Sequence, residues 1–196
     1  MTWIIVGLGN PGEEYTDTRH NAGRMALEVA GKKLCAGEWK EDKKAKATVQ
    51  KGVIGKAPAV FVLPDTFMNK SGTAVLKYVK SVKAAERMIV VYDDLDLPMG
   101  TIKLSFNRGS GGHKGIESIT RALKTKKFTR IRIGVSRATT SGKIKKPSGE
   151  DDVINFILAR FKPAEMAELK IVFKKVTEAI EAIVTEGPER AMNTFN

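Results

Sequence analysis

Four polar residues with side chains suited to acyl hydrolysis follow short apolar runs of this chain. Asn10 and His20 come after the apolar run at 3–8, Asn69 follows FVLPDTF, and Asp93 follows MIVVY. The carboxyl ends of neighbouring parallel strands meet at one edge of an α/β sheet, so these residues, distant in the chain, are expected to lie together. The sequence therefore predicts a polar site at that edge.

A histidine beside a carboxylate forms a general-base pair, because the acid fixes the imidazole tautomer and stabilises the imidazolium. We predict that His20 and Asp93 form such a pair, and asparagine amides would donate to a developing oxyanion without changing charge. The chain has no G-x-S-x-G motif and Cys35 lies in a predicted helix, so water is the natural nucleophile. A serine elsewhere, and a His20 that only supports its loop, stay open as alternatives.

Three glycines of the same amino-terminal stretch offer a second interpretation, a dinucleotide-binding turn. Gly7, Gly9 and Gly12 have the G-x-G-x-x-G spacing directly after the first predicted strand. That fold needs a helix starting at the third glycine and an acidic residue about 20 residues further on. The segment EEYTDTRH that follows has no apolar stripe, and no such acid ends a second strand. We therefore expect no dinucleotide cofactor.

The carboxylates of DDLDLPMG raise the alternative of a metal site at Asp93, Asp94 and Asp96. No histidine or further acid supplies the remaining ligands at a recognisable spacing, so we expect no metal, and Asp94 and Asp96 are expected to shape a turn. His113 lies in NRGSGGHKG, a glycine-rich loop before a predicted helix. It either belongs to an anion-binding helix start or only satisfies backbone amides at the helix entry.

Length and composition bound the class of protein. The 196 residues, 42% of them hydrophobic, suit a single domain over 1–196. The lone cysteine, Cys35, excludes an internal disulfide and a cysteine-based zinc cluster, which favours a reduced, intracellular compartment. The apolar run at the amino terminus is too short for a signal sequence or a membrane span. We expect a cytoplasmic protein with no membrane partner.

The positive charge of the chain is concentrated in one segment. The formal net charge is +12, and 13 of the 34 basic residues fall between Lys103 and Lys146. Between residues 101 and 150 only Glu117 and Glu150 are acidic. Such clustering is typical of a protein that binds a polyanion, most often nucleic acid. A solvated basic face is the alternative.

Short β-rich runs alternate with helical periodicities, which predicts an α/β fold with a mixed sheet flanked by helices. Strands are expected at 3–8, 46–54, 58–63, 88–92, 101–106 and 129–135, and helices at 21–35, 67–82, 113–124, 151–158, 164–186 and 188–195. The turn residues between the second and third strands predict a hairpin.

The segment SGKIKKPSGE, residues 141–150, is polar and rich in glycine and lysine, which predicts a mobile surface loop. Asp151 or Asp152 is expected to cap the helix that follows. Its run VINFIL is apolar nearly all round, which indicates either core packing, the favoured interpretation, or a lid over a cleft.

With these residues assembled, the chain resembles the bacterial-type peptidyl-tRNA hydrolases from end to end. The resemblance rests on five co-linear motifs: IVGLGNPGEEYTDTRHNAG, LPDTFMNKSG, DDLDLPMGTIKL, GSGGHKGI and FTRIRIGV. It implies a monomeric, three-layer α/β fold and no metal requirement. It also implies hydrolysis of the ester between a peptide and the 3′ ribose oxygen of tRNA, which releases the peptide and recycles the tRNA from aborted translation.

The resemblance also assigns roles to particular residues. His20 would be the general base and Asp93 its partner, while Asn10 and Asn69 would act beside the scissile ester. The substrate cleft would further include Tyr15, Met68, His113 and Lys114. Phosphates near the acceptor stem would meet Lys103 and Arg132, which agrees with the charge pattern, because such contacts give affinity without base specificity. The loop 141–150 and the helix after it would border the cleft.

Two positions depart from the family pattern. Lys114 stands where asparagine is usual after the histidine, so a mobile cation replaces an amide, and Ser105 stands where some relatives carry lysine.

The alternative function is a non-catalytic RNA-binding relative similar to some organellar splicing factors, which Lys114 would suit. The presence of the His20 and Asp93 pair with both asparagines argues for the enzyme, because a binding protein has little need of a base and its acid.

Overall fold

The computed structural model describes residues 2–139 and 143–196. Its centre is an eight-stranded sheet in the order β2-β3-β4-β1-β5-β7-β6, with β8 paired to β7. The strands are β1 (Trp3–Gly7), β2 (Lys40–Asp42), β3 (Ala47–Ile54), β4 (Ala57–Pro64), β5 (Met88–Pro98), β6 (Ile102–Phe106), β7 (Thr129–Ala138) and β8 (Ile144–Lys145).

The sheet is mixed, as the sequence predicts. The central strands β4, β1, β5 and β7 pair in parallel, whereas β3 pairs antiparallel with β4 and β6 pairs antiparallel with β7. The predicted hairpin is therefore confirmed as β3 and β4. The parallel strands β1 and β5 are neighbours, so residues that follow β1 reach the carboxyl end of β5.

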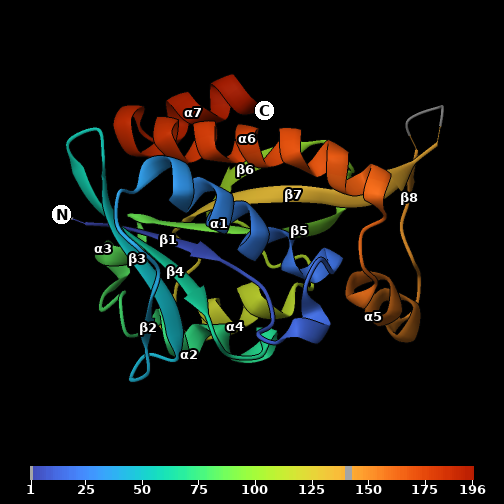
Figure 1. Ribbon diagram of the computed structural model, residues 1–196, viewed down its shortest axis with the longest axis horizontal. Coiled ribbons are helices and arrows are strands. Elements are labelled where there is room, and N and C mark those ends of the chain that lie inside the picture. Colours follow the sequence, from blue (N-terminus) through green and yellow to red (C-terminus); the bar gives the residue numbers. More distant parts are fainter. Residues whose placement is uncertain (1, 140–142) are drawn as a thin grey trace.

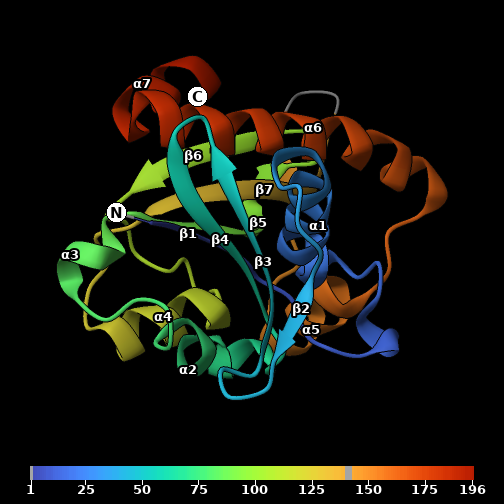
Figure 2. The same cartoon turned by 60° about the vertical axis from the view of Figure 1, so that its left-hand side comes forward.

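Helices cover both faces of the sheet and give three layers (Figure 1). The helices are α1 (Ala22–Leu34), α2 (Ser71–Val75), α3 (Val82–Ala85), α4 (Lys114–Leu123), α5 (Glu150–Leu158), α6 (Pro163–Glu186) and α7 (Pro188–Phe195). One apolar core lies between the sheet and α1, α6 and α7, and a second lies between the sheet and α2, α3 and α4 (Figure 2). Among the described residues, no helix is both long and apolar enough to cross a bilayer.

Glycine lets α1 approach the sheet closely, and this approach places the residues before α1. A Cβ on Gly23 would lie 2.2 Å from the carbonyl oxygen of Val91, and a Cβ on Gly7 would lie 2.7 Å from the carbonyl oxygen of Gly23. Distances this short exclude any side chain at either position. The start of α1 therefore sits directly against β5, and the turn before it lies at the carboxyl end of that strand.

Two of the predicted elements are wrong in extent. The single helix expected at 67–82 is three short helices, a 3-10 turn at Met68–Lys70 followed by α2 and α3. A turn at 76–78 ends α2, and the Ser81 side chain caps α3 by accepting from the Ala84 amide. The strand expected at 88–92 continues to Pro98 because β7 offers further pairing past Tyr92, with an irregular register between Asp94 and Pro98.

The segment around 141–150 also departs from the prediction. Residues 141 and 142 lie outside the described part of the chain, but Ile144–Lys145 form β8 against Arg137 and Ala138. Helix α5 begins at Glu150 with Gly149 as its N-cap, so neither Asp151 nor Asp152 is the cap. Both occupy the first turn instead, where carboxylates are favoured by the helix dipole.

Candidate active site

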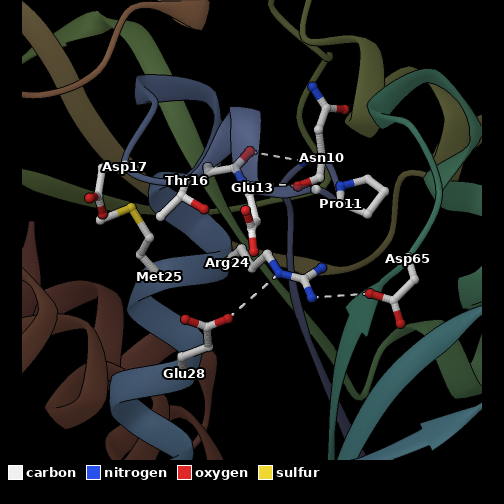
Figure 3. Close-up of a pocket in the computed structure, with 11 residues that line it drawn as sticks. Asn10, Pro11, Glu13, Thr16, Asp17, Arg24, Met25, Glu28 and Asp65 are labelled. Carbon is white, nitrogen blue, oxygen red and sulfur yellow. Dashed lines mark hydrogen bonds and ion pairs between the residues drawn. The ribbon is translucent and has the colours of Figure 1, made fainter.

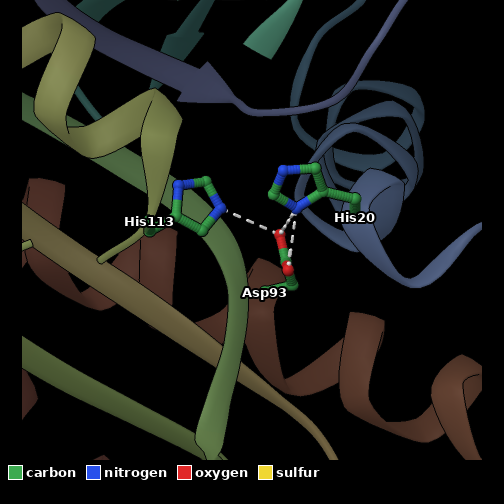
Figure 4. A group of neighbouring side chains, drawn as sticks. All are labelled: His20, Asp93 and His113. Atoms are coloured by element: carbon green, nitrogen blue, oxygen red, sulfur yellow. Dashed lines mark hydrogen bonds and ion pairs between the residues drawn. The ribbon is translucent and has the colours of Figure 1, made fainter. Parts of the chain in front are cut away.

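Three titratable side chains from different elements meet at the carboxyl edge of the sheet (Figure 4). His20 lies in the 3-10 turn Arg19–Asn21 between β1 and α1, Asp93 lies in β5, and His113 is the N-cap of α4. Nδ1 of His20 is 3.0 Å from each carboxylate oxygen of Asp93, and Nε2 of His113 is 3.0 Å from Oδ1. The sequence predicts the His20–Asp93 contact, and folding adds His113 to it.

The contact with Asp93 sets the protonation of His20. Since Nδ1 faces the carboxylate, it carries the proton, and no described residue forms a hydrogen bond with Nε2. Burial lowers the pKa of His20, but attraction by the Asp93 charge and the hydrogen bond to it outweigh burial, so the pKa is raised above 6.5. Nε2 is thus a basic nitrogen with its lone pair free to take a proton.

Asp93 is held ionised inside the protein. Only 2% of the residue is exposed. Burial by itself raises the pKa of this carboxyl, but the two imidazoles, through their charge and hydrogen bonds, bring its pKa well below the usual range. A buried carboxylate with such partners stays charged and orients them.

His113 acts through both ring nitrogens. Its Nδ1 accepts from the backbone amides of Gly115 and Ile116, at 3.2 and 3.4 Å, and so caps α4. A ring that accepts at Nδ1 carries its proton on Nε2, which therefore donates to Asp93. The His113 side chain thus holds the Asp93 carboxylate, and its predicted role in substrate binding stays a prediction. The same tautomer argues against a metal, because Nε2 has no lone pair to offer one.

Arg19, the residue before His20, connects the site to helix α6. Arg19 is 4% exposed, and its guanidinium donates to the carbonyls of Ala159 and Arg160 and to the carboxylate of Glu165 at 2.8 Å. It also lies over the ring of Phe156, 4.7 Å from the centroid. The sequence gives no sign of this role beyond the position of Arg19 beside His20.

A cavity of about 580 Å³ opens over the three side chains. Its walls are the end of β5, the glycine loop before α4, and the segment 146–157. Val153, Ile154 and Ile157 of α5 face it, and no residue of α5 is fully buried. The favoured prediction that this helix is packed into the core therefore holds only for Phe156, which is half-buried against it, and is wrong for Val153, Ile154 and Ile157. Helix α5 forms an apolar wall of the cavity.

The acids that follow Asp93 are engaged in ion pairs across the cavity wall. Asp94 accepts from Arg132 at 2.7 Å, and Asp96 pairs with Lys146 at 2.7 Å. Asp94 also accepts from the Asp96 amide, but both residues lie within β5, so the predicted turn is wrong: this is an irregular stretch of the strand. Because both carboxylates already have cationic partners, they are poorly placed to serve as metal ligands.

Asn10 organises the neighbouring loop. Its side-chain oxygen accepts from the Met68 amide at 2.8 Å, while Asn21 holds the Asn10 backbone through two hydrogen bonds of 2.8 and 3.0 Å. Its amide NH2 has no partner among the described residues. Met68 in turn packs against α4, since a Cβ on Gly115 would come within 2.6 Å of its sulfur.

The other predicted substrate residues lie outside the 580 Å³ cavity, apart from Lys114, which lines it. Asn69 is exposed in the turn Met68–Lys70 and Tyr15 is half-buried. The ring of Tyr15 meets that of Phe67 edge-on, 6.3 Å apart, and Phe67 is 55% exposed. Phe67 is not predicted from the sequence, because its neighbours in FVLPDTF do not distinguish an exposed aromatic residue from a buried one.

A second cavity, of about 390 Å³, adjoins Asn10 (Figure 3). Arg24 crosses it, with Asp65 3.0 Å away on one side and Glu28 3.6 Å away on the other. Burial raises the pKa of Glu28 despite the opposing charge of Arg24. The charge of Arg24 is thus compensated by the two carboxylates, and its ion pair with Asp65 connects α1 to the end of β4.

The predicted phosphate-binding residues lie next to each other in the sheet. Lys103 of β6 is opposite Arg132 of β7, so both side chains are on the same face. Lys103 is exposed, whereas Arg132 is committed to Asp94. Ser105 is buried opposite Arg130, and its hydroxyl has no partner among the described residues.

A mixed α/β sheet that carries a buried histidine–carboxylate pair under a cavity at its carboxyl edge defines an enzyme of the general-base class. Among the described residues, none forms a hydrogen bond with Nε2 of His20, so this nitrogen can accept a proton.

Comparison with known proteins gives the family. The sequence model described as peptidyl-tRNA hydrolase matches residues 4–196, and the chain belongs to this family. The peptidyl-tRNA hydrolase of Aquifex aeolicus is 40% identical over 195 residues, which are 98% of this chain and 95% of that protein. That of Chloroflexus aggregans is 38% identical over 196 residues, which cover 99% and 98%.

Solved structures agree. The crystal structure of peptidyl-tRNA hydrolase from Acinetobacter baumannii matches with a TM-score of 0.87 and 30% identity, covering 100% of this chain and 94% of the other. A peptidyl-tRNA hydrolase crystallised with N-propanol gives the same score at 31% identity, with the same coverage. The predicted family and fold class are confirmed.

Proposed function

We propose that this chain hydrolyses the ester bond of peptidyl-tRNA, with water as nucleophile and His20 as general base. The observation that carries the proposal is the pair of 3.0 Å contacts between His20 Nδ1 and the Asp93 carboxylate, which leave Nε2 free beside a cavity. Family membership supplies the substrate, a peptide esterified to the 3′ ribose oxygen of tRNA.

The reaction follows from the protonation states. His20 Nε2 takes a proton from water as the oxygen attacks the carbonyl carbon of the ester, which gives a tetrahedral oxyanion. The imidazolium, stabilised by Asp93, then gives that proton to the ribose oxygen as the carbon–oxygen bond breaks. The products are a free peptide and a tRNA with its 3′ hydroxyl restored. A general base placed in this way typically increases the reaction rate about 100-fold to 10,000-fold.

Asn10 is proposed to bind the substrate through its amide NH2. Its side-chain oxygen is occupied by the Met68 amide, so the NH2 group is fixed in direction and able to donate to a carbonyl or oxyanion. Asn69, Tyr15 and Met68 are proposed to hold the aminoacyl and peptide parts nearby. The Tyr15–Phe67 ring pair offers an exposed face on which a peptide side chain or base can stack.

The tRNA is proposed to lie across the basic segment. Lys103 is exposed with no ion pair in the part of the chain that the structure describes, and Arg132 is a cation already paired with Asp94. Contacts of this kind hold the phosphate backbone without reading bases. We also propose that the protein works as a monomer in the cytoplasm, where its substrate arises. Size-exclusion chromatography with light scattering checks the first point.

The deciding experiment compares wild type with His20→Ala on N-acetyl-aminoacyl-tRNA. We expect release of the amino acid to fall by about 100-fold or more, while tRNA affinity and melting temperature change little. Equal turnover by the two proteins would disprove the mechanism. An absence of hydrolysis by wild type would instead favour the RNA-binding alternative.

A further inference from the structure

Arg130 of β7 is a buried cation without an acidic partner. Its exposed fraction is 0%, and no carboxylate of the described residues forms an ion pair with it. The guanidinium lies over the ring of Phe128, 4.7 Å from the centroid. Burial and the like charges of Arg132 and Arg108 lower the pKa of Arg130, although Tyr92 opposes them. A charge in such a place costs free energy, so the contacts that offset this cost indicate the role of the residue.

The offsetting contacts go to the glycine loop, residues 107–112, which joins β6 to α4. Nη1 of Arg130 donates to the carbonyl of Gly109, and Nη2 donates to the carbonyl of Arg108. Two charge-assisted hydrogen bonds from one planar guanidinium hold a segment of backbone in one orientation. Arg130 therefore fixes the first half of the glycine loop to the sheet.

The glycine loop has few other restraints. A Cβ built on any of its three glycines meets no atom within 4 Å, so packing does not hold them in place. In the described chain, the hydrogen bonds of Ser110 go to the amides of Gly112 and His113 and to the carboxylate of Glu117. These partners belong to the loop itself or to α4. The hydrogen bonds to Arg130 are thus the connection of the loop to β7.

The place of the glycine loop matters because the loop forms a wall of the cavity over His20. Residues 110–112 line this cavity, and so does Tyr92. The ring of Tyr92 meets that of His113 edge-on, 4.8 Å apart, and its hydroxyl and Arg130 attract each other. Arg130 is therefore in contact with two parts of the cavity wall without lining the cavity itself.

We propose that Arg130 is a positioning residue that fixes the glycine loop as a wall for the substrate and so lowers KM. The buried guanidinium acts through the loop backbone and not on the ester. Without it, the carbonyls of Arg108 and Gly109 can bind water, because both residues are exposed, and the loop is free to leave its place. This inference rests on the proposed function, because the same cavity receives the ester.

The first test compares Arg130→Met with wild type. Methionine occupies similar space without a charge, and no carboxylate loses a partner, so we expect the melting temperature to change little. KM for N-acetyl-aminoacyl-tRNA should rise about tenfold. In contrast, kcat and the rising limb of the pH profile should stay close to wild type, because His20 and Asp93 keep their contact. A lower kcat with unchanged KM would indicate partial unfolding and would overturn the inference.

A second measurement does not depend on catalysis. NMR relaxation of the backbone amides gives order parameters for residues 109–112 in both proteins. We expect these values to fall in Arg130→Met toward about 0.6, which is typical of a flexible segment, while β5 and β7 stay rigid. Unchanged order parameters would overturn the inference even if KM rises. If wild type hydrolyses no ester, the proposed function fails, and the order parameters still show whether Arg130 fixes the loop.

Two further variants separate the effect of position from the effect of charge. Arg130→Lys keeps the charge, but a single ammonium cannot reproduce the planar fork, so we expect an intermediate KM. A wild-type KM in this variant would mean that the charge alone attracts tRNA, and would overturn the inference.

Arg87→Met is the matched control. The guanidinium of Arg87 also lies over an aromatic ring, 5.8 Å from the centroid of Trp3, but Arg87 is exposed and lies outside the cavity. This variant should leave KM and the order parameters of the glycine loop unchanged. A rise in KM equal to that of Arg130→Met would contradict the inference.

Discussion

Oδ1 of Asp93 accepts hydrogen bonds from two imidazole rings, since Nε2 of His113 and Nδ1 of His20 each lie 3.0 Å from it. The His113 ring is itself fixed by the α4 amides that donate to its Nδ1. The amino terminus of α4 therefore orients the Asp93 carboxylate, which in turn orients the His20 ring. In the sequence, Asp93 lies 73 positions after His20.

His113→Asn separates the two functions of that ring. Asparagine is a good N-cap, so α4 should keep its stability, but the shorter side chain loses the hydrogen bond to Asp93. The carboxylate then attracts the His20 proton more strongly and the pKa of His20 rises further. We expect kcat/KM at pH 7 to fall by about threefold to tenfold, with the rising limb of the pH profile moved to higher pH. His113→Phe, which loses the cap as well, should also lower the melting temperature. A pH profile identical to that of wild type would show that His113 has a capping role only.

Asp93→Asn should move the same limb in the opposite direction. In the proposed mechanism the neutral form of His20 is the active one, so in wild type we expect the rate to rise with pH through a pKa above 6.5. Without the carboxylate, burial dominates and the pKa of His20 falls below that value. We expect activity to reach its plateau at lower pH, at a level about 100-fold to 10,000-fold lower. The measurement is kcat/KM on N-acetyl-aminoacyl-tRNA from pH 5 to pH 9, and an unshifted limb would contradict the pairing.

Arg19→Met should be strongly destabilising. The substitution leaves Glu165 without its bidentate partner and frees the carbonyls of Ala159 and Arg160. Removal of one member of a buried pair typically costs about 3–5 kcal/mol. Urea denaturation measures the free energy of unfolding.

A matched control is available on the same carboxylate. Arg137 lies 3.5 Å from Glu165, but 58% of its side chain is exposed. Arg137→Met should therefore cost no more than about 1 kcal/mol. If the two variants lose the same free energy of unfolding, burial of the Arg19–Glu165 pair does not contribute to stability.

Lys103→Gln tests the proposed tRNA surface. We expect KM to rise at low salt. The slope of log KM against log salt concentration should fall by about 1, the amount that one phosphate contact contributes. Lys33→Gln, on an exposed turn at the end of α1, removes the same charge away from the basic segment and should change neither quantity. The tRNA surface must lie elsewhere if the two variants show the same salt dependence.

Much of the architecture follows from local pattern. The apolar runs and their spacing give the order of strands and helices because each element shows its own periodicity. The predicted element boundaries are wrong where tertiary contacts override the local periodicity. Strand β5 continues past Tyr92 because β7 offers a partner, and the region 67–82 is broken into short helices between turns.

The sequence by itself determined the fold class, the concentration of charge, and the pairing of His20 with Asp93, because residue type and position after parallel strands suffice for these. Only the tertiary structure decided that His113 is the second partner of Asp93 and that Arg19 is bound to Glu165. It also decided that α5 lines the cavity and that Lys114 has no ion pair with the residues that the structure describes. The physical reason is that a hydrogen bond or a buried charge depends on atoms within about 3 Å in space, which spacing along the chain does not specify.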